Sequence, residues 1–393
     1  MNNQNSRGAA KAILAAAEGW FCTATGVLEA EPPVRVSGPV TLNSISEYAD
    51  LVHHLTRKTL VLRGSPKFRK FVRPSLFGVI DGFVLPRAEW APMTRDGRVL
   101  AFEMVINIEG VASVLRGGGG LEVDETVRVH PSQRVIVIGA SDNWYDFILY
   151  YLPRLLAVLE LGVIEDGWSV ALGGGQGAFF REITALLGVP AEQVIWLEED
   201  QAHFFPRAIY LSNMNSVEGF LHPLSISLLK ESFPERISSG VAGTRKRIFV
   251  SRAKVERRRL LNEHELYPGL TRRGFSIIHP ETLSLTEQVD VFRAARDVAG
   301  VHGAGLVNTV WSKRLERVLE ISYAPHTDQP ATLDIAVGRM TGSLGAEHRF
   351  VRATNEETIS PGNHMGDFKV DPERFFVEFD AFMQREAALT IRG

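Results

Sequence analysis

Basic side chains are concentrated in one short stretch of this chain. Eight of the fifteen residues in 245–259 are Lys or Arg, and Glu256 is the single acidic residue among them. The chain as a whole carries a net charge of −3. Positive charge concentrated in this way suits the binding of a small polyanion such as a diphosphate. Arg252 is the first candidate, because it follows a strand-like run and a guanidinium can hold two phosphate oxygens at once. A surface ion pair is the alternative for this residue.

A glycine turn, His302-Gly303-Ala304-Gly305, lies further along the same half of the chain. Residues 298–301 before it are short and apolar, as in a buried parallel strand, and a helix can begin near Leu306. The first amides of a helix lack internal partners and carry partial positive charge, so a diphosphate could bind there. A tight strand-to-helix turn without a ligand is the alternative. The basic stretch upstream favours binding.

Three consecutive arginines follow Arg252 and are expected on a helix over about residues 257–266. On a helix, Arg257, Arg258 and Arg259 would point about 100° apart, so at most two of them reach one ligand. His302 would contact a phosphate or a sugar, or would act as a base if its imidazole is neutral. A histidine bonded to the backbone is its structural alternative.

Four other polar residues near these motifs have a binding and a structural interpretation. Asn262 and Glu263 either bind the ligand or cap and pair locally. Asn308 falls in the first turn of the expected helix and either contacts the ligand or braces the loop. Glu320 ends a strand-like run, where a carboxylate can accept two ribose hydroxyls. A solvated surface charge is the alternative for Glu320.

The arrangement of strand and helix patterns predicts an α/β protein of two domains. The chain has 393 residues, of which 45% are apolar, enough for two cores. Short buried strands alternate with amphipathic helices twice, which indicates parallel sheets covered by helices. We expect a β-rich segment over 1–130, Rossmann-like domains over 131–237 and 244–365, and a closing helical segment over 366–393. Small residues at 238–243 mark the linker, and residues beyond 341 are read as polar loops up to the closing helix.

Composition excludes several classes of protein. No apolar run approaches the roughly 20 residues that span a bilayer, and the alanine-rich residues 8–19 predict a helix rather than a signal peptide. The single cysteine, Cys22, excludes an internal disulfide and a cysteine-based zinc site. The slightly acidic net charge argues against nucleic-acid binding. We therefore expect a cytoplasmic protein.

Several short motifs occur in an order and spacing that resemble glycosyltransferase family 61. They are Ser251-Arg252, Arg258-Arg259-Leu-Leu-Asn262-Glu263, Gly274-Phe275, Leu285-x-x-Gln288, His302-Gly-Ala-Gly-Leu-x-Asn308 and Val318-Leu-Glu320-Ile321. A weaker stretch, Asn143-Trp-Tyr-Asp146-Phe with Leu152-Pro-Arg154-Leu, extends the resemblance toward residue 140. The family implies a GT-B fold, in which two Rossmann-like domains face a cleft and a C-terminal helix, here within 366–393, packs back on the first domain. A helix expected over residues 223–233 would end that first domain. The family also implies transfer, with inversion, from a nucleotide sugar.

The resemblance assigns roles to the residues that match its motifs. Donor-binding residues would be Arg252, Arg258, Asn262, Glu263, His302, Gly303, Ala304, Gly305, Asn308 and Glu320. Asn143, Trp144 and Tyr145 would contact the acceptor, a glycan or a lipid-linked saccharide. Asp146 stands where the family often has histidine, and either Asp146 or His302 would take the acceptor proton. Aspartate at a strand-to-helix junction is also a good helix N-cap, which is the structural alternative.

The reaction so implied needs no resident cofactor. A nucleotide sugar, expected to be UDP-linked, would be the co-substrate, and cationic side chains with helix amides would neutralise the leaving diphosphate without a metal. By resemblance to bacterial members, the setting would be surface or capsular polysaccharide assembly. Lipid-linked acceptors would bring the protein to the inner face of the membrane.

Two other functions stay open. The loop at residues 173–178 fits Gly-x-Gly-x-x-Ala after a strand, with Glu198 and Glu199 after the next strand, which predicts an NAD(P)-dependent oxidoreductase. Against it, the loop lies well inside the chain, and the basic stretch would have no role. The departure at Asp146 also leaves open a protein that binds nucleotide sugars without turnover.

Overall fold

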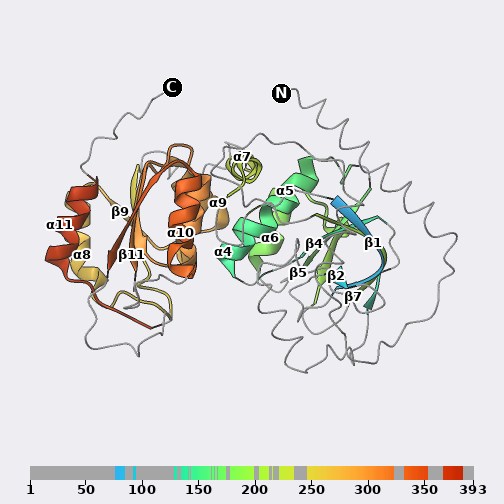
Figure 1. Cartoon of the computed structure of the whole chain (residues 1–393), viewed down its shortest axis with the longest axis horizontal. Helices are drawn as coiled ribbons and strands as arrows, with labels where there is room; N and C mark the ends of the chain where they lie inside the picture. The colour runs from blue at the N-terminus through green and yellow to red at the C-terminus, as the bar shows by residue number, and fades with distance from the viewer. Residues whose placement is uncertain are drawn as a thin grey trace. The chain divides into compact units, whose positions relative to one another are not determined.

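The computed structural model describes most of the chain from residue 128 onward and two earlier strands. The described ranges are 76–84, 92–93, 128–130, 134–139, 141, 143–160, 162, 164–165, 167–173, 178–198, 203–211, 215, 221–233, 246–322, 332–352 and 366–383. Contacts between residues divide the chain into two compact units, 1–217 and 218–393. Figure 1 labels helices and strands of both units.

The described part of the first unit is a mixed sheet with helices. Its strands are β1 (Leu76–Val84), β2 (Pro92–Met93), β3 (Arg128–Val129), β4 (Val135–Gly139), β5 (Ser169–Gly173), β6 (Val194–Leu197) and β7 (His203–Leu211). Its helical segments are α4 (Trp144–Asp146), the π-helical η3 (Phe147–Tyr151), α5 (Leu152–Glu160), α6 (Ala178–Leu186) and the 3-10 turn η4 (Ala191–Gln193).

The first sheet has the strand order β2-β1-β7-β4-β5-β6, with β3 paired to β7. Strands β7, β4, β5 and β6 run parallel, whereas β1 is antiparallel to β7. The four parallel strands follow the Rossmann half-order 3-2-1-4, so the chain reverses direction across the sheet between β4 and β7. β4 is buried along its whole length, as expected for a central parallel strand.

The helix that follows β4 is interrupted by a π-helical turn. Pro153 has no backbone N–H, so it cannot bond the carbonyl of Leu149 one turn earlier. The side-chain amide of Asn215 donates to that carbonyl instead. The π-helical turn begins directly after Asp146, and such turns inside α-helices often lie at functional sites.

The described part of the second unit is an all-parallel sheet between two layers of helices. Its strands are β8 (Arg247–Val250), β9 (Ser276–Ile278), β10 (Asp297–Val301), β11 (Arg317–Ser322) and β12 (Glu347–Arg352). Its helices are α7 (Pro223–Glu231), α8 (Glu263–Arg272), α9 (Leu285–Ala294), α10 (Thr332–Ser343) and α11 (Pro372–Met383), with 3-10 segments η6 (Pro280–Thr282) and η7 (Ala304–Trp311).

The strand order of the second sheet is β12-β11-β10-β8-β9. Numbered along the chain, this is the doubly wound order 2-1-3-4-5, whose topological switch point lies between β8 and β10. Helices α8 and α11 cover one face of the sheet, and α9 and α10 cover the other (Figure 1). Phe375 and Phe379 of α11 are buried in an apolar cluster with Phe249 of β8 and Leu319 of β11.

The predicted alternation of strands and helices is confirmed in both halves of the chain. The expected helix over 257–266 is wrong at its start, because α8 begins at Glu263 and Arg258 has a φ of 56°. The prediction of polar loops beyond 341 is wrong at Glu347–Arg352, which form β12, and residues 353–365 lie outside the described residues. The linker at 238–243 and most of the N-terminal segment lie outside the described residues. No helix among those described has the length and apolarity needed to cross a membrane.

Two helices differ in placement from the expectation. Helix α7, expected to end the first domain, groups with the second unit, where Phe233 just after it packs edge-on against Trp311 and accepts a hydrogen bond from Arg293 Nη2 at 2.6 Å. The closing helix was expected to pack back on the first domain. In the structure, the buried face of α11 packs on the second unit's own strands and on α8.

Candidate functional site

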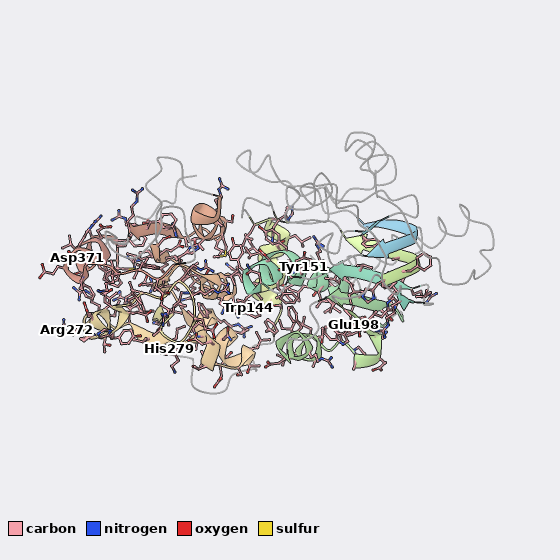
Figure 2. The ribbon with its side chains drawn as sticks, turned by 90° about the horizontal axis from the view of Figure 1, so that it is seen from below. Trp144, Tyr151, Glu198, Arg272, His279 and Asp371 are labelled. Atoms are coloured by element: carbon pink, nitrogen blue, oxygen red, sulfur yellow. The ribbon has the colours of Figure 1, made fainter. Side chains whose placement is uncertain are left out.

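The switch point of the second sheet brings Arg252 and the glycine turn together. Arg252 lies two residues beyond β8, and His302 and Gly303 follow the neighbouring strand β10 directly. In open α/β sheets, ligands bind at the carboxyl ends of the strands on either side of this point. His279, labelled in Figure 2, ends the outer strand β9 at the same edge.

The Arg252 side chain lies directly against the glycine turn. A Cβ built on Gly303 would be 2.1 Å from Arg252 Nη1, so only glycine leaves room for the guanidinium. Arg252 Nη2 donates to the Arg257 carbonyl at 2.8 Å, and Nε donates to the Arg258 carbonyl at 3.2 Å. Neutral carbonyls therefore hold the guanidinium in place without cancelling its charge.

Two cations near the turn lack a carboxylate partner. Within the described part of the chain, neither Arg252 nor Arg258 forms an ion pair, and the buried Nε of Arg258 has no hydrogen-bond acceptor. Burial, together with the nearby charge of Arg258, lowers the pKa of Arg252 to about 10, while the charges of Glu281, Glu263 and Asp367 act in the opposite direction. Burial also lowers the pKa of Arg258. A bound anion would stabilise both charges.

Arg259 is already engaged by a carboxylate. Its guanidinium pairs with Asp367 Oδ2 at 2.9 and 2.6 Å from Nε and Nη2, and its backbone N–H donates to Oδ1 at 2.8 Å. Nearby, Leu260 forms a parallel bridge with Phe368. We call residues 366–370 the C-terminal strap, since this segment closes the arginine loop, residues 252–259. The geometry thus separates Arg258 from Arg259, a distinction that the sequence made only weakly.

Asn262 and Glu263 brace the site from within the fold. Asn262 exchanges hydrogen bonds with the backbone of Val370, at 2.8 and 3.2 Å. Glu263 is buried, and its carboxylate accepts from the Ser251 hydroxyl, from the Arg252 N–H at 3.0 Å and from the Tyr267 hydroxyl at 2.7 Å. These bonds fix the chain where β8 ends. In the structure, Asn262 and Glu263 therefore have local bracing roles.

The glycine turn continues into the 3-10 helix η7. Gly305 lies close to Val250 of β8, since a Cβ on it would be 3.3 Å from Val250 Cγ1. The N–H groups of Ala304 and Gly305 open this helix, where the first amides have no internal acceptors. Asn308 is buried and donates to Gln288 Oε1 at 2.9 Å, so it braces η7 against α9.

His302 is the outer member of a three-residue polar chain. Its Nδ1 bonds to Glu320 Oε1, and His348 Nε2 bonds to Glu320 Oε2 at 2.8 Å. The Glu320 side chain is 0% exposed, against 18% for His302 and 10% for His348. Burial alone would raise the pKa of Glu320, but the two histidine hydrogen bonds outweigh it, so its pKa lies below the usual value.

The predicted ribose contact at Glu320 does not match this geometry. Both of its carboxylate oxygens are used by histidines, and the side chain does not reach the surface. Glu320 therefore acts on the site through His302. His348 was not predicted, because its strand lies in a segment read as loop.

The carboxyl edge of the first sheet carries the aspartate. Asn143 caps α4 by accepting from the Tyr145 N–H at 2.9 Å, so Asn143 is the N-cap and Asp146 is not. Asp146 lies in the first helical turn, partly exposed, and Ser141 Oγ donates to it at 3.4 Å. Trp144 is partly exposed at the start of this helix, and Tyr151, further along, is buried (Figure 2).

A buried arginine supports this edge from behind. Arg154 is 1% exposed and donates from Nη1 to the carbonyl of Ile138 in β4 at 3.0 Å. Gly139, at the end of β4, has a φ of 94°, and a Cβ there would lie 2.7 Å from the ring of Tyr151. The sequence places Arg154 in a motif without giving it a role. In the structure it ties the helix to the strand that ends beside Asp146.

The position of the second glycine loop disfavours a dinucleotide site. In the dinucleotide fold the fingerprint follows the first strand, at the switch point. Here it follows β5, which pairs with β4 on the side away from β7. Glu198 (Figure 2) forms an ion pair with Arg128 at 3.0 Å. Residues 174–177 and Glu199 lie outside the described residues.

No group of three or more His, Cys, Asp or Glu side chains is arranged to hold a metal ion in the described ranges. The polar groups at the two carboxyl edges are those suited to anion binding and proton transfer. On the second edge, Arg252 lies against Gly303, where η7 begins. On the first, Asp146 is a partly exposed carboxylate that accepts a hydrogen bond from Ser141.

One family model matches part of the chain. The glycosyltransferase 61 family model matches residues 144–319, from the start of α4 into β11. No curated protein matches the chain. Among solved structures, the chain is similar to TibC, an iron-containing dodecameric bacterial glycosyltransferase from enterotoxigenic E. coli H10407, at 11% identity and a TM-score of 0.28. That alignment covers 73% of this chain and 97% of TibC, and at such a TM-score it carries no argument about the site.

Proposed function

We propose that this chain, whose residues 144–319 match the glycosyltransferase 61 family model, is a glycosyltransferase whose second unit binds the diphosphate of its nucleotide-sugar donor at the switch point between β8 and β10. One observation carries the proposal. The Arg252 guanidinium lies against Gly303 and is held by neutral carbonyls, so its charge stays available beside the open amides of η7. A diphosphate there would gain charge-assisted hydrogen bonds.

Each residue around the diphosphate has a stated role in this proposal. Arg252 and Arg258 neutralise the charge that develops on the leaving group as the sugar departs. Gly303, Ala304 and Gly305 supply backbone N–H groups. His302 contacts the diphosphate or the sugar from the same edge. Asn262, Glu263 and Asn308 hold the loops in place and do not contact the donor.

The acceptor side of the proposal rests on the first unit. Transfer with inversion needs a base that removes the proton of the acceptor hydroxyl as the sugar is attacked. Asp146 is the group we assign to this step, with Asn143, Trp144 and Tyr145 around the acceptor. With this assignment we also propose a GT-B arrangement, in which the carboxyl edge of each Rossmann-like unit binds one substrate.

The finer identity of the substrates comes from family resemblance alone. We infer a UDP-linked donor and a saccharide hydroxyl as acceptor, free or lipid-linked. Assembly of a surface or capsular polysaccharide is the setting we propose. The enzyme would then work on the cytoplasmic side of the membrane, associated with its surface where the acceptor is lipid-linked.

A nucleotide panel with matched variants tests this function. UDP should raise the melting temperature of the full chain, because a ligand that binds only the folded state stabilises it. Arg252→Ala should weaken UDP binding about 100-fold, through loss of the charge-assisted hydrogen bonds. Arg272→Ala, at an exposed arginine ending α8 (Figure 2), should bind like the unaltered chain.

Three results would count against parts of the proposal. Equal UDP affinity in the two arginine variants would place the donor elsewhere. A shift with another nucleoside diphosphate and none with UDP would overturn the UDP assignment alone. Tight UDP binding without hydrolysis or transfer from any UDP-sugar would favour a binding protein without turnover.

A further inference from the structure

We propose that His348 is a positioning residue which, through Glu320, holds the proton of His302 on Nδ1, so that Nε2 is the nitrogen presented at the switch point. The proposal rests on the proposed function only for what Nε2 meets there. His348 lies outside the matched family region and was not predicted from the sequence. Its side chain is mostly buried, so it acts through its neighbour and not on a ligand.

The hydrogen bonding of Glu320 fixes which nitrogens carry protons. An ionised carboxylate can only accept hydrogen bonds. With Glu320 ionised, His302 Nδ1 and His348 Nε2 must both be N–H donors. A protonated Glu320 would donate its proton to one histidine, and that histidine nitrogen would then carry no proton. The hydrogen bond from His348 Nε2–H stabilises the ionised carboxylate, which in turn favours the form of His302 with its proton on Nδ1.

His348 is held so that its Nε2 faces Glu320. Strand β12 pairs in parallel with β11, with His348 opposite Val318 and Phe350 opposite Glu320, which places His348 and Glu320 on one face of the sheet. A Cβ on Gly338 of α10 would lie 3.0 Å from His348 Nδ1. Phe350 meets the ring edge-on at 4.4 Å. The imidazole is thus confined between a glycine and an aromatic ring.

The consequence appears at the exposed part of His302. Its backbone N–H donates to the Ile321 carbonyl at 2.8 Å, so main chain and ring are both anchored on β11. The ring extends from the buried carboxylate toward the surface beside Gly303. With Nδ1 committed, Nε2 of a neutral ring accepts a proton or a hydrogen bond, and Nε2 of a protonated ring donates to a phosphate oxygen. The ring therefore keeps the same orientation whether His302 is neutral or protonated.

The test uses ¹⁵N-histidine NMR of the full chain, with His302 assigned through His302→Gln. The unaltered protein should show His302 with its proton on Nδ1. His348→Gln, whose amide nitrogen can replace Nε2, should keep that form, whereas His348→Leu should mix the two tautomers. His264→Leu, on the exposed face of α8, is the matched control and should change nothing at His302.

A second measurement connects the tautomer to binding. UDP affinity should fall about tenfold in His348→Leu and stay within about twofold in His348→Gln. If His348→Leu fails to fold, Gly338→Ala replaces it, because the added Cβ displaces the His348 ring. An Nε2–H form of His302 in the unaltered protein, or equal behaviour of the Leu and Gln variants, would overturn the proposal. Absence of UDP binding in the unaltered protein would instead refute the donor assignment, while the NMR result still decides the role of His348.

Discussion

The carboxyl edges of the two sheets are built differently. At the second edge, Arg252 and His302 are each fixed by bonds on the side away from the proposed ligand, through carbonyls and through Glu320. At the first edge, Asp146 lies partly exposed in the first turn of a helix, just before a π-helical turn. In our proposal, the fixed groups of the second edge bind the charged donor, and Asp146 at the first edge takes the acceptor proton. Two sheets of similar topology would then serve two different tasks.

Replacing the carboxylate should have the largest effect and should separate the two edges. Asp146→Asn keeps size and polarity but removes the base, so we expect kcat to fall by about 100-fold or more. UDP affinity should stay within about twofold, because the donor binds the other unit in our proposal. Turnover of the UDP-sugar identified in the nucleotide panel measures the first quantity, and calorimetry with UDP the second. A UDP affinity that falls in parallel with kcat would contradict the division of tasks.

Two glycines of the second unit should give opposite outcomes. A Cβ on Gly303 would meet the side chain of Arg252, which can shift without moving the core, so Gly303→Ala should weaken UDP binding about tenfold with little change in stability. A Cβ on Gly300, within β10, would lie 2.8 Å from Val250 Cβ and 2.9 Å from the Val250 carbonyl oxygen. Gly300→Ala should therefore destabilise the fold by about 1–3 kcal/mol.

Urea unfolding with UDP titration checks both variants. A Gly303→Ala protein as unstable as Gly300→Ala would show that the turn serves the core. If Gly303→Ala bound UDP normally, the contact between Arg252 and the glycine turn would not matter for the donor.

The smallest expected effect is a pH dependence of stability through Glu320. The pKa of Glu320 in the folded protein lies below the usual value of 4.5, so its contribution is present above pH 4.5 and is lost as pH falls through the folded pKa. Glu320→Gln lacks this titration. The difference in unfolding free energy between the two proteins should therefore shrink below pH 4.5. Urea unfolding from pH 3.5 to pH 7 measures it, and a constant difference would refute the assignment.

Much of the fold followed from local patterns in the sequence. Buried strands such as β4 and β10 are short apolar runs, and the glycine turn after β10 marks the switch point. The predicted candidates Arg252, His302 and Gly303 meet at this one place. Local apolar runs and turn residues are set by neighbouring positions, which is why sequence patterns report them.

What the sequence did not predict depends on contacts between distant residues. No local signal in the sequence shows that the helix begins only at Glu263, because arginine is a good helix former. The loop takes its form from bonds to Asp367 and Phe368, more than a hundred positions later. The partnership of Glu320 with His348 likewise needs the pairing of β11 with β12. The bracing roles of Asn262 and Glu263 also depend on their hydrogen bonds with Val370 and Ser251, which the sequence does not reveal.

The C-terminal strap has a consequence for how the protein is made. Arg259, Leu261 and Asn262 take their hydrogen-bond partners from residues 367–370. During synthesis, the arginine loop cannot adopt the described form until the strap has left the ribosome. Strands β8 to β12 are translated before it. The arginine loop thus takes its described form only after all five strands of the second sheet have been translated.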